Sequence, residues 1–258
     1  MVLRKKLLME APNLRVAVCH YAPGERHKVH TDRHSRVSFL LHGGYREEGN
    51  SGAIRMRPGD ILLKSNRAEH EDRFGDEGAH VAAIEFLDND PFAAGPADAF
   101  WRQRTDTFAL RHVTALLEAV RAGDLRGASV AGVDLVTASV HTDEHKRRAP
   151  PWLEQLKLEL EEHSFATVDV ADRAQDAGVH PAHASRLFRQ CYGASMTEHA
   201  HAHSVRRAMG ALAQPNLSLS DAAFTAGFYD QSHMNRAFVR MFGRTPGMQR
   251  SLLTATIG

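Results

Sequence analysis

The stretch AGVHPAHASRLFRQCYG, residues 177–193, returns in altered form as AGFYDQSHMNRAFVRMFG, residues 226–243. Arg186 of the first copy and Arg236 of the second lie 50 residues apart. Each copy is typical of a helix, a tight glycine turn and a second helix that carries arginines. This is the sequence form of a helix-turn-helix unit, whose second helix enters the major groove of DNA. Two copies in register therefore predict a double DNA-binding unit.

The residues around each copy predict where the helices begin and end. Asp169 and Ser218 are expected to cap the first helix of each unit, because their side-chain oxygens can accept hydrogen bonds from free backbone N–H groups. Gly178 and Gly227 are expected to end those helices, since glycine takes a left-handed turn without strain. Residues 195–212, between the units, are long enough for one rigid connecting helix.

Exposed polar side chains on the two second helices are the candidate DNA contacts. We assign Arg186 and Arg236 to base edges, because arginine can bond guanine with two parallel N–H groups. Arg189 and Arg240 lie a turn further on and are assigned to phosphate. The full set is His183, Arg186, Arg189 and Gln190 in the first unit, and Gln231, Ser232, His233, Arg236 and Arg240 in the second. The alternative is that these arginines only keep the exposed helix faces hydrated and do not contact DNA.

The net charge of the chain gives no indication of a DNA partner, but the distribution of the charged residues does. The 258 residues include 32 Lys+Arg and 31 Asp+Glu, so the formal net charge is only +1. After residue 180 the basic residues outnumber the acidic ones, which favours phosphate binding. A solvated charged surface would show the same excess. These bases are Arg186, Arg189, Arg206, Arg207, Arg236, Arg240, Arg244 and Arg250.

Other totals bear on the compartment. The chain has 2 cysteines, Cys19 and Cys191, far apart and without metal-ligand spacing, which is typical of a reducing compartment. Neither a signal peptide nor a run of ~20 apolar residues is recognisable. We therefore expect a cytoplasmic protein with no membrane partner.

The chain to about residue 88 is expected to be β-rich. Short apolar or alternating runs, such as LRVAVCHY (residues 14–21) and HVAAIEFL (residues 80–87), are separated by turn-like segments. GGYREEGNSG (residues 43–52) and SNRAEHEDRFGDEG (residues 65–78) are two of these segments. Regular short strands with such turns predict an antiparallel barrel or sandwich.

Helical patterns follow, from about 97 to 122 and from about 127 to 147, before the proline pair at 150–151. These helices are expected to pack on the barrel, to form a dimer seam, or both. A further helix is expected from Trp152, with an apolar stripe of Trp152, Leu153, Leu156, Leu158 and Leu160. The expected organisation is a β domain at 1–96, a helical linker region at 97–149 and a DNA-binding domain at 150–258.

Residues 150–251 resemble the DNA-binding domain of AraC/XylS-type bacterial transcription regulators. The similarity lies in GVHPAHASRLFRQCYGAS (residues 178–195), SLSDAAFTAGFYDQSHMNRAFVRMFGRTP (residues 218–246) and Arg250. The whole chain resembles the family's arrangement of a cupin-like sensor followed by this domain. The resemblance implies an α+β multidomain fold, with an N-terminal antiparallel β-barrel, linker helices, and a C-terminal all-α domain of two helix-turn-helix units joined by a helix.

The two units differ in how closely they match the family. Arg173 and Ala184 stand where the first unit usually has leucine, and Ala182 offers only a methyl group at a potential base contact. Outside the first unit, His199 and Gln249 replace usual tyrosines and Met234 replaces a usual phenylalanine. The second unit remains nearer the pattern, so we predict that Arg236→Ala weakens DNA binding more than Arg186→Ala.

The spacing Gly24-x5-His30-x-Asp32-x3-Arg36-x6-Gly43 resembles the first cupin motif. The family has His-x-His and Glu where this chain has His30, Asp32 and Arg36, and a guanidinium cannot bind a cation. No cofactor is therefore required, and a divalent metal is left open. The candidate effector or metal residues are His27, His30, Asp32, His34, Arg36 and His70. They could instead be surface histidines, and Arg36 could pair with a carboxylate-bearing effector.

These observations favour a sequence-specific DNA-binding transcription regulator rather than an enzyme. Its two recognition helices would read adjacent major grooves, which recur about 34 Å apart. The implied partners are double-stranded DNA, a small-molecule effector, a second copy of the chain and, for an activator, RNA polymerase. The alternatives are a cupin-type metalloenzyme with an accessory helical domain, and a β domain that only dimerises.

Overall fold

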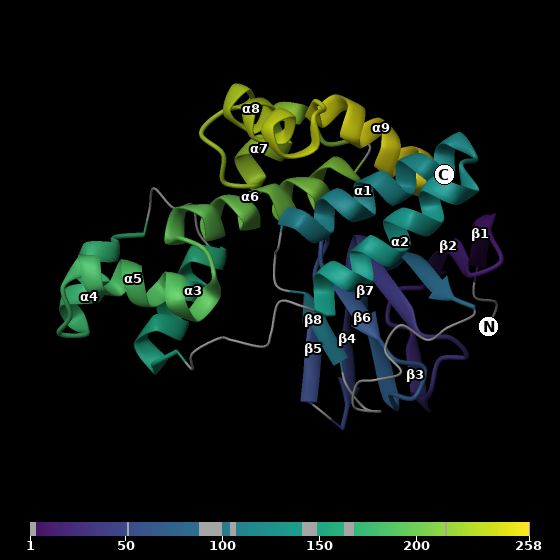
Figure 1. Ribbon diagram of the computed structural model, residues 1–258, viewed down its shortest axis with the longest axis horizontal. Coiled ribbons are helices and arrows are strands. Elements are labelled where there is room, and N and C mark those ends of the chain that lie inside the picture. The colour runs from purple at the N-terminus through teal and green to yellow at the C-terminus, as the bar shows by residue number, and fades with distance from the viewer. Residues whose placement is uncertain are drawn as a thin grey trace.

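The computed structural model describes residues 4–50, 52–87, 100–103, 107–140, 149–162, 168–214 and 216–257. Within them, a β-sheet body carries helices on one side, and a smaller group of helices extends away from it (Figure 1). The strands are β1 (Arg4–Glu10), β2 (Leu14–Tyr21), β3 (Arg26–His30), β4 (Arg36–Gly49), β5 (Gly52–Met56), β6 (Ile61–Lys64), β7 (His70–Phe86) and β8 (Phe100–Gln103).

The described strands form one antiparallel sheet in the order β1-β2-β7-β4-β6-β8. β3 adds to β7, and β5 adds to β4. The long strands β4 and β7 pair with each other at both of their ends, and the register shifts near Gly43. Gly43 has a φ of +74°, and a Cβ there would collide with the carbonyl of Gly78. The two strands therefore bend past each other where only glycine fits.

Both faces of the central strands are buried. Side chains alternate between the faces of a strand, so Leu40 and Leu62 join an inner cluster while Phe39 and Leu63 join an outer one. The outer cluster also holds residues of the first two helices, such as Leu116. Burial on both faces explains why the sequences of these strands are continuous apolar runs.

Two segments expected to be turns are largely strand. β4 continues to Gly49, and β7 begins at His70. In β7 the buried His70, Asp72 and Phe74 alternate with Glu71 and Arg73, which are more exposed. Charged side chains on both faces hid this alternation from a hydrophobicity pattern. The misassigned segments are the ones that line the polar interior of the sheet.

The helices are α1 (Thr107–Ala122), α2 (Leu125–Val140), α3 (Pro151–Glu162), α4 (Val170–Asp176), α5 (Pro181–Tyr192), α6 (Met196–Leu212), α7 (Leu219–Thr225), α8 (Gln231–Phe242) and α9 (Pro246–Ile257). The helix expected from residue 97 was wrong at its start, because β8 pairs with β6 before α1 begins. The helix expected to about 147 is described only as far as Val140, since residues 141–148 lie outside the described part of the chain. The expected connecting helix at 195–212 is confirmed by α6.

The helical part has two separate apolar cores. The first unit has its own core, made of Leu153, Leu156, Leu160, Ala174, Ala184, Leu187, Phe188, Cys191, Met196 and Ala200. The second unit shares the outer core of the sheet, in which Phe238 and Leu252 lie in one cluster with α1, α2 and the second half of α6. Leu158 was expected in the apolar stripe of α3, but it is 54% exposed because it points away from that core.

The connecting helix α6 also contacts the sheet directly. Nη1 of Arg206 donates to Oδ1 of Asp60 at 2.5 Å, and both side chains are buried. A Cβ on Gly59 would strike the backbone of Arg206, and one on Gly210 would strike Pro58. The turn at residues 58–60 therefore packs tightly on α6. The expected fold class is confirmed: an antiparallel β-rich N-terminal part, linker helices, and two helix-turn-helix units joined by a helix.

In the described part of the chain, every helix is too short or too polar to cross a membrane.

Candidate functional site

The first helix-turn-helix unit has the predicted local chemistry. The Asp169 carboxylate accepts from the backbone N–H groups of Ala171 and Asp172 and so begins α4. Gly178 has a φ of +69° directly after that helix. Ala174 is fully buried, which lets α4 and α5 approach closely. The expected cap, turn and close contact are confirmed.

The second unit repeats this arrangement. The Ser218 hydroxyl accepts from the backbone N–H of Asp221 and begins α7. Gly227 has a φ of +82°, and Asp230 caps the N-terminus of α8 by accepting from the backbone N–H of His233. Ala223, which corresponds to Ala174, is also fully buried.

The two recognition helices expose matching faces. Among the candidate DNA contacts, all are exposed except His233, which is half-buried. Its ring packs edge-on against Phe228, with centroids 5.3 Å apart. Two of the exposed side chains already contact a neighbour: Nη2 of Arg189 lies 3.9 Å from the Glu198 carboxylate, and the Gln231 amide oxygen accepts from the hydroxyl of Ser220. Their roles in DNA contact stay predictions.

The two faces carry the same number of arginines but place the second one differently. Positions 186 and 236 both carry arginine. One turn further on, exposed Arg189 corresponds to Val239 and exposed Gln190 corresponds to Arg240. Each helix therefore offers two arginines, but the second arginine projects in a different direction. The two helices are expected to meet different features of DNA.

Several of the counted basic residues are not on these faces. Arg206 is 7% exposed and paired with Asp60. Arg207 donates to the backbone carbonyls of Glu161 and Ala226. Arg244 forms an ion pair with Glu118 of α1, so it ties the second unit to the linker helices. The local excess of positive charge therefore overstated the DNA-facing charge.

A second group of polar residues lines the interior of the sheet body. Lys64, at the end of β6, is fully buried. Its Nζ lies 3.0 Å from Oδ2 of Asp32, 3.1 Å from Oε2 of Glu47 and 2.6 Å from Nε2 of His70. Burial lowers the pKa of His70 to about 4, and the positive charge of Lys64 acts in the same direction. The lysine ammonium thus occupies the centre of three potential metal ligands.

Arg36 and Asp32 form the other ion pair of this interior, with Nε of Arg36 3.3 Å from Oδ2 of Asp32. Burial alone would raise the pKa of Asp32, but Arg36 and Lys64 outweigh burial and hold that pKa well below its usual range. Burial also raises the pKa of Glu47 to about 7, with Lys64 opposing the rise. The place where the cupin motif would hold a metal is therefore already occupied by the side chains of Lys64 and Arg36.

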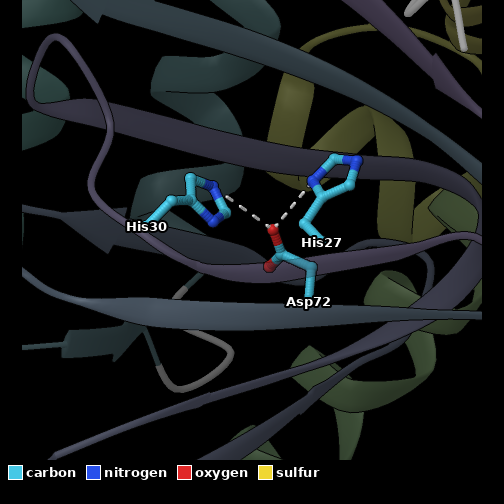
Figure 2. A group of neighbouring side chains, drawn as sticks. All are labelled: His27, His30 and Asp72. Carbon is cyan, nitrogen blue, oxygen red and sulfur yellow. Dashed lines mark ion pairs between the residues drawn. The ribbon is translucent and has the colours of Figure 1, made fainter.

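His27 and His30 meet Asp72 at the edge of this interior (Figure 2). His27 of β3 pairs with Asp72 of β7, and His30 of β3 pairs with His70 of β7. The register shifts between these two pairs. Residues three apart normally point to opposite faces of a strand. The bulge inserts one extra residue in β3, so both histidines face the same side.

The structure brings together most, but not all, of the predicted effector residues. His27, His30, Asp32, Arg36 and His70 line one connected polar interior. His34 belongs to none of the His, Asp and Glu groups found among the described residues. Sequence reasoning missed Glu25, Glu47, Lys64 and Asp72. All four lie in segments that were expected to be turns or at the last position of an expected strand, and their charged character was the available signal.

Another His and Glu cluster lies inside the first helix-turn-helix unit. Oε1 of Glu161 on α3 is 3.3 Å from Nε2 of His199 and 3.4 Å from Nε2 of His203, both on α6. Nη2 of Arg206 donates to Nδ1 of His203 at 2.9 Å. Since Nδ1 accepts, the proton of the neutral ring is on Nε2 and faces Glu161. This cluster is internally hydrogen-bonded and joins α3 to α6.

Comparison with known proteins agrees with the helical geometry. Residues 173–251 match the family model described as a helix-turn-helix domain. The chain is similar to the HTH-type transcriptional regulator GlxA of Rhizobium meliloti, with 36% identity over 83 residues, 32% of this chain. It spans only 26% of the length of that relative. The resemblance of this segment to AraC/XylS-type regulators is confirmed.

Two solved structures are similar at low identity. ToxT from Vibrio cholerae O395 has a TM-score of 0.38 and 11% identity, covering 95% of this chain and 99% of its own. A cupin superfamily protein from Desulfitobacterium hafniense has a TM-score of 0.30 and 15% identity, covering 34% of this chain and 79% of its own.

Proposed function

We propose, from the helix-turn-helix domain at residues 173–251, that this chain is a sequence-specific DNA-binding transcription regulator. The observation that carries the proposal is the pair of matched exposed faces on α5 and α8. Arg186 and Arg236 occupy the same place on two helices that share one capping and turn pattern. Paired recognition helices on one chain suit an asymmetric site that spans two adjacent major grooves.

The candidate contacts divide by chemistry. Arg186 and Arg236 are proposed to read base edges, with His183, Ser232 and His233 beside them. Arg189 and Arg240 are proposed to meet phosphate, with Gln190 and Gln231 near the ends of their helices. Loss of a base-reading arginine costs affinity for the specific site, whereas loss of a phosphate contact weakens all sequences alike.

Selection of random duplexes by the full chain, followed by sequencing, tests this function. We expect enriched sites with two conserved blocks about one helical turn apart, at both low and moderate salt. The double variant Arg186→Ala/Arg236→Ala should lose that enrichment. Arg55→Ala removes one positive charge from the exposed surface of β5, so it is the charge-matched control for each single variant, and it should retain the enrichment. Uniform, salt-sensitive retention of every duplex would reduce the protein to a nonspecific binder.

The N-terminal part is proposed to sense an effector or to dimerise, in a cytoplasmic protein that contacts RNA polymerase if it activates. The proposed domains are residues 1–96, 97–149 and 150–258. The α2 helix supports a second copy as partner, because Val130 and Val133 are more than half exposed on it, at 54% and 53%. Sedimentation of the free protein would test the dimer.

The metalloenzyme alternative is less well supported. The ammonium of Lys64 and the guanidinium of Arg36 fill the interior at the position of the cupin-like motif. A catalytic metal needs an open coordination position there, which these cations oppose. A relative that shares the helix-turn-helix segment, GlxA of Rhizobium meliloti, is a transcriptional regulator.

A further inference from the structure

His27 and His30 on β3 and Asp72 on β7 place three potential ligand atoms together (Figure 2). Nδ1 of His27 lies 3.3 Å from Oδ2 of Asp72, and Nε2 of His30 lies 3.8 Å from the same oxygen. Ligands that bind tetrahedral zinc at ~2.0–2.1 Å are separated from one another by roughly 3.3 Å. Small side-chain movements would therefore complete such a geometry.

The other nitrogen of each ring is already engaged. Nδ1 of His30 lies 2.8 Å from the carbonyl oxygen of Lys28, and Nε2 of His27 lies 3.0 Å from Oε1 of Glu25. Both oxygens only accept, so these nitrogens carry the protons. In the neutral rings, the unprotonated nitrogens then face Asp72. Metal-bound histidines have this arrangement, with a carbonyl or carboxylate holding the far nitrogen.

Glu25 is itself fixed in place. Its Oε2 accepts from the backbone N–H of Ala22 at 2.7 Å, and its side chain is nearly buried. The ring of His27 also packs edge-on against Tyr21 and Phe74, with centroids 5.6 and 5.4 Å away. The orientation of His27 is therefore set by the fold rather than by a bound ligand.

The ion pairs of Asp72 among the described residues are all with histidines: His27, His30 and His70. Its side chain is 4% exposed, and its Oδ1 is buried without a hydrogen-bond partner among the described residues. With neutral rings, two nitrogen lone pairs converge on its other oxygen and no proton lies between them. A buried carboxylate in such surroundings is costly unless a cation is present. A divalent cation among these three atoms would supply the missing charge.

The neighbouring His70 has a different role. Lys64 donates to Nε2 of His70, which is also 3.9 Å from Oδ2 of Asp72. The groups that contain His70 with Asp32 or Glu47 therefore surround an ammonium already in place. Within the described part of the sheet body, His27, His30 and Asp72 form the only such group in which no member has an ion pair or hydrogen bond with Lys64 or Arg36.

We propose that His27, His30 and Asp72 form a binding site for a divalent transition metal such as Zn²⁺, which shares only His30 with the cupin-like motif, with Glu25 as a positioning residue. Two imidazole ligands favour zinc and nickel over magnesium and calcium, which prefer oxygen. The metal site stands independently of the helix-turn-helix domain. Its use as a regulatory signal rests on the proposed DNA-binding function.

Zinc titration of the chelator-treated full chain, in competition with a chromophoric chelator, tests the site. We expect one high-affinity Zn²⁺ per chain. His27→Gln and Asp72→Asn should each weaken binding by more than the ~10–100-fold expected when an outer hydrogen-bond partner of a ligand is lost. Glu25→Gln should fall within that range, because it removes only the carboxylate that orients His27.

Two further variants separate this site from its competitors. His199→Gln alters the cluster in the first helix-turn-helix unit and should leave zinc affinity unchanged. Asp32→Asn alters a ligand that the motif would use and should retain the bound zinc, with thermal melting as the check on folding. Absence of high-affinity zinc binding in the wild-type chain would overturn the proposal. So would retention by His27→Gln.

The regulatory part needs a separate measurement. Binding of the selected duplex should change on zinc addition for the wild-type chain, and the change should be absent in His27→Gln. If zinc binds but DNA affinity does not respond, the site is a metal site without this regulatory role. If zinc binds and no duplex is selected, the proposed DNA-binding function fails while the metal site stands.

Discussion

The two helix-turn-helix units share a sequence pattern and differ in what surrounds them. The first unit packs α3, α4 and α5 against the start of α6 around a core of its own. The second unit packs α7, α8 and α9 into the same apolar cluster as the outer face of the sheet and the linker helices. α6 belongs to both. The same local motif can therefore be an independent module or part of a larger body, depending on what its apolar face meets.

This difference has a consequence for signal transmission. A change in the sheet body can reach the second unit through continuous packing and through the Arg206–Asp60 pair. The first unit is linked to the body through α6.

The largest effect is expected from truncating the phenylalanine at the centre of each core. Phe188→Ala and Phe238→Ala should each cost about 3–5 kcal/mol of unfolding free energy, because both side chains are fully buried. Hydrogen exchange should speed up only in α3 to α6 for the first variant. For Phe238→Ala, exchange should speed up in α7 to α9 and also in α1 and the sheet. Faster exchange in the sheet of Phe188→Ala would contradict two separate cores.

Loss of the contact between α6 and the sheet should come next. Arg206→Met leaves the buried Asp60 carboxylate without its guanidinium, at a cost of about 3 kcal/mol. The double variant Arg206→Met/Asp60→Asn should recover part of that loss in chemical denaturation. An additive double variant would mean that the two side chains do not act as a pair.

The DNA contacts should differ between the units. Arg236→Ala is expected to weaken binding of the selected duplex by about 1–3 kcal/mol, and Arg186→Ala by less. The reason is that the first unit departs further from the family pattern, with Ala182 offering only a methyl group near Arg186. A gel-shift titration compares the two variants, and equal losses or a larger loss for Arg186→Ala would count against the asymmetry.

The smallest effect is a pH dependence of the first unit. Burial lowers the pKa of His203 to about 2, and the charge of Arg206 acts in the same direction, while Glu161 opposes them. The folded state therefore stays unprotonated where the unfolded chain takes up a proton, below about pH 6.5. The contribution of His203 to the free energy of unfolding is therefore complete above about pH 6.5 and is lost as the pH falls below it. Protection factors in α3 to α6, which correct for the intrinsic pH dependence of exchange, measure it at pH 7 and pH 5, and His203→Gln should remove the difference.

Much of the helical domain was predictable because its signals are local. Asp169, Ser218, Gly178 and Gly227 act on backbone groups within a few residues of themselves. The sheet was harder. Glu47, His70 and Asp72 lie on strands that looked like turns, since a strand whose inner face is polar has no apolar alternation.

The sequence by itself determined the two matched helix-turn-helix units, their caps, and the exposed faces of α5 and α8. Only the tertiary structure decided which basic residues face outward, because Arg206 is buried by a turn 146 residues away. It also decided the site at His27, His30 and Asp72. A bulge in β3 and its register on β7 bring these residues together, and strand pairing over some 40 positions leaves no mark in the spacing of the residues themselves.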